Sequence, residues 1–297
     1  MNDAGEPEHD RQVREYYDHN TGCFLRWGED QGRSNIHGAL WPPGVRSLAE
    51  AMNYSNELVA REIESCPHPV QRVLDLGCGV GGTLFYLGRR LPCVQLLQGF
   101  SLSPGQIDHA RHRIPENQNE RFFFAEGCFL QLPAERIQAD FSYAVESFAH
   151  GPDPERFFAV QAQILQPGGR LVIIDDCLSD PIPSRGLPAR HARLLDVYRR
   201  NWLLPGLRGV IALQSIAETK GFRLIRQRNL TPHLRLGRPR DRMIALLVRL
   251  FGSRMERHTY LKALVGGDAK QKCYREGLID YQLMVFEKQA CGAERDG

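Results

Sequence analysis

A short apolar run followed by three alternate glycines at residues 73–81 constrains this chain more than any other feature. The run is Val-Leu-Asp-Leu, and Gly77, Gly79 and Gly81 follow it before the next expected helix. A strand that turns this tightly needs residues without a Cβ, and their absence lets a ligand lie directly against the backbone. The spacing differs from the GxGxxG of dinucleotide sites, and Asp75 would repel a pyrophosphate. The pattern therefore predicts a ligand that carries a cationic amine.

Strands alternate with helices from residue 70 onward. This alternation predicts an α/β fold, a Rossmann-like, mostly parallel sheet of seven strands with helices on both faces. The expected strands are 70–76, 94–100, 121–126, 140–146, 170–175, 222–229 and 281–288, and the expected helices between the first five are 83–91, 104–113 and 154–165. Ligands of such sheets bind beyond the carboxyl ends of the strands, where the glycine turn also lies.

The remaining segments define the expected domain organisation. Residues 1–68 are predicted to be a separate helical segment, with helices at 11–18 and 45–65 and a Trp-Pro-Pro-Gly break at 41–44. The main domain is expected to span 69–290, with a helical insert at about 178–220, a basic helical stretch at 234–264 and a tail at 291–297. The insert is expected to cover the substrate, and it offers a surface for a homo-oligomer.

Composition excludes several classes of protein. No apolar run approaches the roughly 20 residues that span a bilayer, and the N-terminus is acidic and polar, so we expect a cytoplasmic protein without a transmembrane segment. The eight cysteines form no CxxC pair, which favours reduced thiols and no metal site. A net charge of +3 is too small to indicate a nucleic-acid partner. The eleven bases between Lys220 and Arg257 form either a solvated face or a site for an anionic substrate or acidic surface.

With the glycine turn and a Leu-Gln-Pro-Gly-Gly turn before the fifth strand, residues 70–176 resemble the class I S-adenosylmethionine-dependent methyltransferases. In that family the loop after the first strand holds the methionyl end of the cofactor, a residue after the second strand meets the ribose, and the loop after the third meets adenine. The resemblance implies S-adenosyl-L-methionine as the cofactor. The residues implied at its methionyl end are Asp75, Gly77, Cys78, Gly79 and Gly81.

The ribose and adenine positions depart from the common pattern. Most relatives carry an acid where Ser101 stands, whereas Ser101 with Gln106 offers only neutral hydrogen bonds, beside Leu102. An acid is also common at Cys128, and its absence leaves backbone amides and Phe129 for adenine. Members similar to sterol methyltransferases and cyclopropane-fatty-acid synthases also lack the first acid. The alternatives are that Ser101 is a turn residue and Cys128 a small core residue.

Two further stretches narrow the resemblance. Residues 145–157 are similar to the end of the fourth strand in sterol 24-C-methyltransferases and bacterial prenyl-diphosphate C-methyltransferases. Residues 16–41 are similar to the segment that forms a lid in the same enzymes. The resemblance implies that residues 1–68 cover cofactor and substrate and exclude water, with Tyr17 near the sulfonium unless it serves packing.

Glu146, at the carboxyl end of an apolar strand, is the expected catalytic residue and is also expected to contact the cofactor. An alkene that attacks a methyl donor becomes a carbocation, which a fixed carboxylate stabilises and then deprotonates. His150 is a second base or a neighbour of the cation, or it holds the loop. Glu146 could instead be a cap or a surface ion-pair partner. The residues expected to line the substrate pocket, each with core packing as the alternative, are Trp27, His37, Trp41, Tyr54, Phe148, Tyr198 and Trp202.

These observations favour a C-methyltransferase that methylates an alkene carbon of an isoprenoid in terpenoid biosynthesis, with a prenyl diphosphate as the leading substrate. A diphosphate needs arginines or a magnesium ion at its head group. Two alternatives remain within enzymes: a sterol or neutral terpenoid, and a small aromatic, amine or hydroxyl metabolite. A catalytically silent binding subunit is disfavoured by the intact glycines, Asp75 and Glu146.

Overall fold

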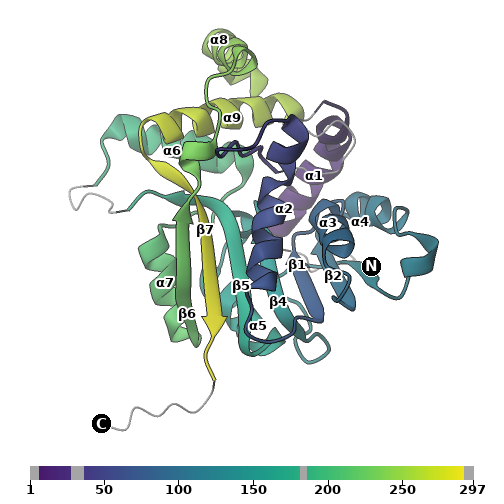
Figure 1. Cartoon of the computed structure of the whole chain (residues 1–297). Coiled ribbons are helices and arrows are strands. Elements are labelled where there is room, and N and C mark those ends of the chain that lie inside the picture. The colour runs from purple at the N-terminus through teal and green to yellow at the C-terminus, as the bar shows by residue number, and fades with distance from the viewer. Residues whose placement is uncertain (1–6, 28–36, 181–185, 291–297) are drawn as a thin grey trace, which may run out of the picture.

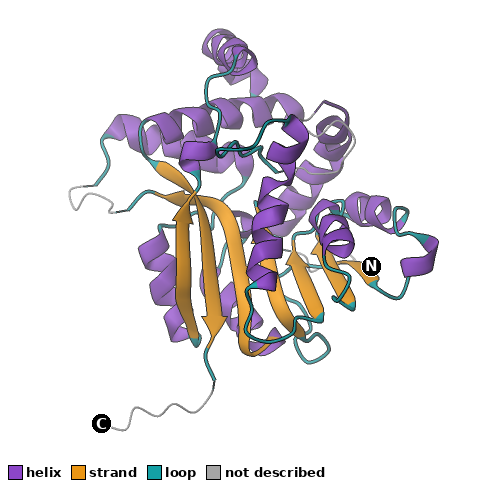
Figure 2. Ribbon diagram, viewed as in Figure 1, coloured by secondary structure: helices purple, strands orange, loops and turns teal. Residues whose placement is uncertain are grey.

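The computed structural model describes residues 7–27, 37–180 and 186–290. Within these residues seven strands form one sheet in the order β3-β2-β1-β4-β5-β7-β6 (Figures 1 and 2). The strands are β1 (Arg72–Leu76), β2 (Leu96–Ser101), β3 (Phe122–Glu126), β4 (Ala139–Val145), β5 (Leu165–Leu178), β6 (Phe222–Asn229) and β7 (Ile279–Lys288). Only β7 runs antiparallel to its neighbours, so the predicted mostly parallel, seven-stranded Rossmann-like sheet is confirmed.

Helices cover both faces of the sheet because its strands are apolar on both sides. Helices α2 (Leu48–Glu64), α3 (Gly82–Arg90) and α4 (Pro104–Arg111) share one core with the side chains of Val73 and Val172. Helices α5 (Pro154–Ile164) and α7 (Val210–Thr219) share the other core with Leu74 and Ile173.

Local sequence signals set where these helices begin. Ser103 accepts a hydrogen bond from the amide of Gln106 and precedes a proline at the first turn of α4. At the start of α5, Asp153 accepts a hydrogen bond from the amide of Arg156 and also precedes a proline. Such caps satisfy amide groups that have no partner inside the helix. Gly81 begins α3 with a φ of 80°, a conformation that glycine adopts without steric cost.

Four helices lie beyond the carboxyl ends of the parallel strands, at the top of Figure 1. They are α1 (Glu8–Trp27), α6 (Ala189–Trp202), α8 (Pro239–Met255) and α9 (Thr259–Arg275). Helix α9 packs against α6, α8 and α1. This group of helices forms a roof over the edge at which a ligand is expected. No helix among the described residues is both long enough and apolar enough to cross a bilayer.

Several predicted boundaries differ from the structure. Helix α1 is longer than the predicted 11–18, and β5 includes the Gln-Pro-Gly-Gly stretch that we expected to be a turn. The basic stretch 234–264 contains two helices, α8 and the start of α9, which continues to Arg275. The predicted insert at 178–220 does not form one cover over the site. Helix α6 belongs to the roof, whereas Leu213 and Ala217 of α7 are buried against the sheet. The predicted tail 291–297 lies outside the described residues.

Candidate active site

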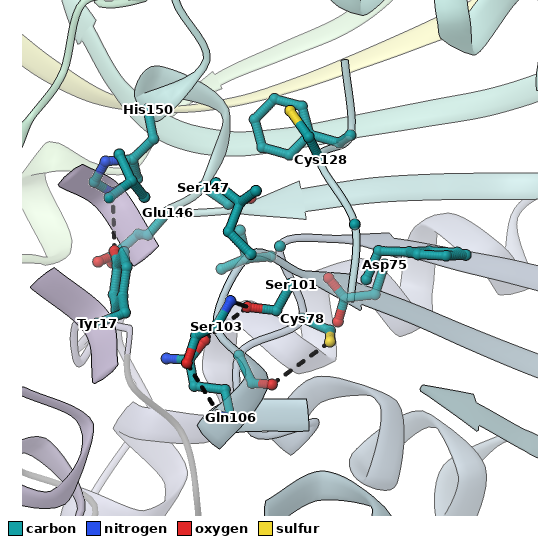
Figure 3. Close-up of a pocket in the computed structure, with 18 of the residues that line it drawn as sticks. Tyr17, Asp75, Cys78, Ser101, Ser103, Gln106, Cys128, Glu146, Ser147 and His150 are labelled. Atoms are coloured by element: carbon teal, nitrogen blue, oxygen red, sulfur yellow. Dashed lines mark hydrogen bonds between the residues drawn. The ribbon is translucent and has the colours of Figure 1, made fainter. Parts of the chain in front are cut away.

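The glycine turn after β1 forms the floor of a cavity at the carboxyl edge (Figure 3). The amides of Gly77 and Cys78 both donate hydrogen bonds of 2.9 Å to the carbonyl of Phe100, which holds the turn against β2. Gly77 has a φ of 93°. A Cβ there would lie 2.4 Å from the Cβ of Ser147. The turn therefore needs glycine both for its conformation and for space.

The cavity contains nearly all residues that the sequence assigned to the cofactor. Those that line it are Tyr17, Asp75, Gly77, Cys78, Gly79, Ser101, Leu102, Gln106, Cys128, Phe129 and Glu146. Gly81 lies outside the lining: a Cβ at this position would lie 2.8 Å from the ring of Phe124, so this glycine shapes the turn. Asp10 and Val13 of α1 also line the cavity, although no sequence motif marks them.

Asp75 provides a buried carboxylate beside the turn. Its side chain accepts a hydrogen bond of 2.7 Å from the Tyr143 hydroxyl. Burial raises the pKa of Asp75 to about 7, although that hydrogen bond acts in the opposite direction. A cationic amine would favour the ionised form of this carboxylate. Asp75, the open glycine turn and the cavity above them therefore fit the methionyl end of S-adenosylmethionine.

Helix α1 closes the cavity through polar contacts with α4. Ser101, at the end of β2, donates a hydrogen bond of 2.8 Å to the side-chain oxygen of Gln106. The side-chain amide of Gln106 donates to Thr21 of α1 at 3.0 Å. Ser103 and Asp18 form a second hydrogen bond between the two helices. These contacts hold α1 over the cavity as a cover.

Glu146 lies between this cavity and a second, larger one, and it lines both. Its φ of 51° is unusual for a residue with a side chain, and such strain is typical of functional sites. Oε1 accepts hydrogen bonds from the Gly38 amide at 2.7 Å and from the Tyr281 hydroxyl at 2.8 Å. Burial raises the pKa of Glu146, but Lys270, His37 and these two bonds outweigh burial and leave the pKa below its usual value. Glu146 is therefore a half-buried, ionised carboxylate.

His150 is held as a neutral imidazole. Its Nδ1 lies 3.0 Å from the carbonyl of Leu203, which can only accept, so Nδ1 carries the proton. Nε2 then accepts from the Tyr17 hydroxyl at 2.8 Å. Burial lowers the pKa of His150 to about 4. Tyr17 and His150 form a neutral pair that lines both cavities.

The second cavity has a volume of about 330 Å³ and joins the first at Tyr17, His37, Glu146 and His150. Of the residues predicted to bind substrate, His37, Trp41, Tyr198 and Trp202 line it. Tyr54 instead packs against one core from α2, and Phe148 is a buried residue of the other core, since apolar neighbours surround both rings. Trp27 ends α1, and its side chain lies outside the described residues.

A charged cluster at the floor of the second cavity was not predicted from the sequence. Lys270 of α9 lies 3.0 Å from a carboxylate oxygen of Asp176 at the end of β5. Tyr198 and Tyr274 also donate hydrogen bonds to Asp176. The carboxyl end of a strand could have indicated Asp176, because active-site residues gather there. No pattern in the sequence marked Lys270, since it lies on a helix with little amphipathic character.

Three arginines stand at the rim of the second cavity: Arg235, Arg238 and Arg240. The guanidinium carbon of Arg235 lies 3.4 Å from the ring centroid of Trp41. Arg190 of α6, by contrast, does not line this cavity and pairs with Glu276. The basic stretch that begins at Lys220 therefore supplies the rim of the cavity.

Comparisons with known proteins show what this chain is similar to. Residues 74–173 match the family described as "Methyltransferase domain". An O-methyltransferase of Pyrenophora dematioidea is 30% identical over 205 residues, which cover 67% of this chain and 72% of that protein. The 24-methylenesterol C-methyltransferase 2 of Arabidopsis thaliana is 26% identical over 208 residues, which cover 70% of this chain and 55% of that protein.

Among solved structures, geranyl diphosphate C-methyltransferase of Streptomyces coelicolor A3(2), in complex with Mg²⁺, geranyl diphosphate and S-adenosyl-L-homocysteine, has a TM-score of 0.69. The identity is 18%, and the match covers 95% of this chain and 98% of that chain, which establishes a shared fold. The chain spans between about half and three quarters of the length of the curated relatives it matches.

Proposed function

Because this chain belongs to the class I S-adenosylmethionine-dependent methyltransferases, we propose that it methylates an alkene carbon of an isoprenoid. A prenyl diphosphate is the favoured substrate, in terpenoid biosynthesis. The observation that carries the proposal is Glu146, a half-buried, ionised carboxylate that lines both cavities.

The basicity of the site supports an alkene over an alcohol or amine. A hydroxyl or ammonium substrate must lose a proton before or during attack, which needs a base with a pKa near neutrality. The pKa of Glu146 lies below its usual value, and that of His150 is about 4. Both are weak bases. Asp175, whose pKa burial raises to about 7, also lines the second cavity, but it is buried and both of its carboxylate oxygens accept backbone amides, from Ala149 and Asp176. An alkene attacks without prior loss of a proton, and the resulting carbocation is acidic enough for a weak base.

When bound, S-adenosylmethionine would supply an electrophilic methyl group on a sulfonium, whose methyl–sulfur bond breaks in the transfer with its electron pair left on sulfur, so that S-adenosylhomocysteine is the leaving group. Asp75 and the glycine turn hold the methionyl end, and α1 covers the cavity. As the alkene forms its new bond to the methyl carbon, Glu146 stabilises the positive charge that develops on the substrate. The carboxylate then accepts a proton from a carbon beside that charge, and the electrons of the broken C–H bond restore the double bond.

The second cavity suits an isoprenoid with an anionic head. The rings of Trp41, Tyr198 and Trp202 provide apolar walls whose faces favour a cation. Arg235, Arg238 and Arg240 supply positive charge at the rim for a diphosphate, which would arrive with a magnesium ion as its counter-ion. A sterol or neutral terpenoid would use the walls without the arginines.

A second candidate activity is O-methylation, which the Tyr17–His150 pair favours. A substrate hydroxyl that donates to the Tyr17 oxygen could pass its proton through that hydroxyl to Nε2 of His150, 2.8 Å away. The relative from Pyrenophora dematioidea bears the name of an O-methyltransferase. The low pKa of His150 makes this the weaker candidate.

The test is an assay with methyl-labelled S-adenosylmethionine and a substrate panel. The panel contains geranyl, farnesyl and isopentenyl diphosphates, a sterol, a phenol, an aliphatic alcohol and an amine. We expect labelled product with at least one prenyl diphosphate and loss of that product in Glu146→Gln. Product with only the phenol, alcohol or amine would reject the isoprenoid proposal, and loss of that activity in Tyr17→Phe would identify the O-methylation route.

The cytoplasmic location and the homo-oligomer remain predictions.

A further inference from the structure

Helix α8 presents a continuous apolar stripe to solvent. Met243, Leu246, Leu247, Leu250 and Phe251 are between 40% and 61% exposed. Their spacing of three and four residues places them on one face of the helix. In globular proteins such a stripe normally faces the core, whereas here it faces away from α9, on which α8 packs. In Figure 1 α8 stands at the top of the molecule, beyond α9.

Arginines border this stripe. At 3.6 residues per turn, Arg242 and Arg249 lie along one edge of it, and Arg240 and Arg254 lie near its two ends. All four side chains are exposed. The helix contains a single acidic residue, Asp241, which pairs with Arg238. The outer face of α8 is therefore apolar at its centre and cationic at its border.

We propose that α8 docks in the interface of an anionic lipid bilayer. An interfacial helix buries its apolar face at the boundary between head groups and acyl chains, and its basic residues lie against lipid phosphates. The five apolar residues of α8 supply the first element and its four arginines supply the second. Docking of this kind needs no helix that crosses the bilayer.

Charge and area favour a bilayer over a second copy of the chain. Two α8 stripes packed face to face in antiparallel orientation would bring Arg242 and Arg249 of both copies together, and like charges repel. Five half-exposed side chains on one helix also offer less surface than the roughly 800 Å² per partner of a standard interface. An anionic lipid surface matches both the apolar centre and the cationic border.

The position of α8 gives the docking a consequence for the active site. Arg240, Asp241 and Ile244, in the first turns of the helix, line the second cavity. A docked α8 would therefore hold the rim of this cavity beside the head groups, where a lipid-dissolved amphiphile could enter. The docking itself does not depend on which substrate is methylated, so its test is independent of the assay above.

The test is sedimentation with vesicles of phosphatidylcholine alone or mixed with phosphatidylglycerol. We expect the wild-type chain to bind the mixed vesicles at least tenfold more tightly than the neutral ones. Leu246→Glu/Leu250→Glu should weaken binding to the mixed vesicles at least tenfold. Arg242→Gln/Arg249→Gln should remove most of the preference for anionic lipid.

The matched control is Ile211→Glu, because Ile211 is 64% exposed on α7, which packs on the sheet away from α8 (Figure 1). This variant should bind vesicles like the wild type. Binding of S-adenosylhomocysteine, measured by calorimetry, would show that each variant is folded. No residue of α8 lines the cofactor cavity, so the substitutions should leave this binding unchanged. The proposal would be overturned if the wild-type protein did not bind anionic vesicles. It would also be overturned if Leu246→Glu/Leu250→Glu bound them as tightly as the wild type. So would self-association in ultracentrifugation that this double variant abolishes.

Discussion

The backbone amide of Gly38 donates a hydrogen bond of 2.7 Å to Oε1 of Glu146, across 108 residues of sequence. A Cβ on Gly38 would lie 3.3 Å from the same oxygen. The segment before α2 thus fixes the position of the carboxylate that faces both cavities. Any movement of that segment would change the hydrogen bonding of Glu146, so closure of the site and orientation of its carboxylate are coupled.

Glu146→Gln should lower kcat by about 10²–10³-fold, because it removes a fixed negative charge from the position where positive charge develops. Glutamine keeps an oxygen that can accept from Gly38 and Tyr281, so the cofactor cavity should keep its shape. Calorimetry should therefore show a dissociation constant for S-adenosylhomocysteine within about threefold of wild type, or roughly 0.6 kcal/mol. Near-wild-type turnover would remove Glu146 from the chemistry.

Tyr281→Phe should change the acidity of Glu146 without changing its charge at neutral pH. The lost hydrogen bond stabilised the ionised form, so the pKa of Glu146 should rise. We expect kcat to fall about tenfold, in line with a charge-assisted hydrogen bond of about 1.5–3 kcal/mol. The acid limb of the pH–rate profile should move to higher pH. A uniform loss of rate at all pH values would instead mean that Tyr281 serves only packing.

The sequence predicted those parts of the site that depend on the backbone. A strand that ends in alternate glycines has few alternative conformations, so the turn, Asp75 and the carboxyl-edge location of the cavity followed from local pattern alone. The structure also brings Ser101 and Gln106, both named for the ribose position, into hydrogen-bond contact.

The roof of the site could not be predicted in the same way. Lys270 meets Asp176 because α9 crosses the edge of the sheet, and no local period encodes that crossing. Tyr54 and Trp41 are both aromatic residues near the start of the chain, yet one faces a core and the other a cavity. Which side an aromatic ring faces depends on the packing of helices that are distant in sequence.

The affinity for the cofactor should depend on pH through Asp75. The pKa of about 7 in the free protein means that the carboxyl becomes protonated as the pH falls from 8 to 5. A cationic amine binds the ionised form, so binding of S-adenosylhomocysteine should weaken, approaching tenfold per pH unit below 7, and should release protons. Calorimetry in two buffers of different ionisation enthalpy measures that release.

Two variants control this prediction. Asp75→Asn should bind more weakly and lose the pH dependence between 5 and 8. Asp175→Asn should keep it: burial also raises the pKa of Asp175 to about 7, but Asp175 lines the second cavity. Unchanged pH dependence in Asp75→Asn would show that another group holds the amine.

Lys270→Met should destabilise the fold, because it leaves Asp176 and Glu146 buried without their cation. Breaking a buried ion pair in this way costs about 3–5 kcal/mol. In the wild type burial alone would lower the pKa of Lys270, but the carboxylates of Asp176 and Glu146 outweigh burial and raise it. The contribution of Lys270 to stability therefore persists wherever its side chain is protonated and is lost only at strongly alkaline pH.

In the variant the loss of stability should itself depend on pH. Uncompensated buried carboxylates prefer to be protonated, so the destabilisation should be largest at pH 8 and should shrink toward pH 5. Denaturant unfolding at several pH values measures this. Lys272→Met is the matched control, since Lys272 is 46% exposed, pairs with Asp268 one turn away and should contribute at most about 1 kcal/mol. Two results would contradict the role of Lys270 as the cation that compensates the carboxylates of Asp176 and Glu146. One is an equal loss of unfolding free energy in the two variants, and the other is a loss in Lys270→Met that grows toward pH 5.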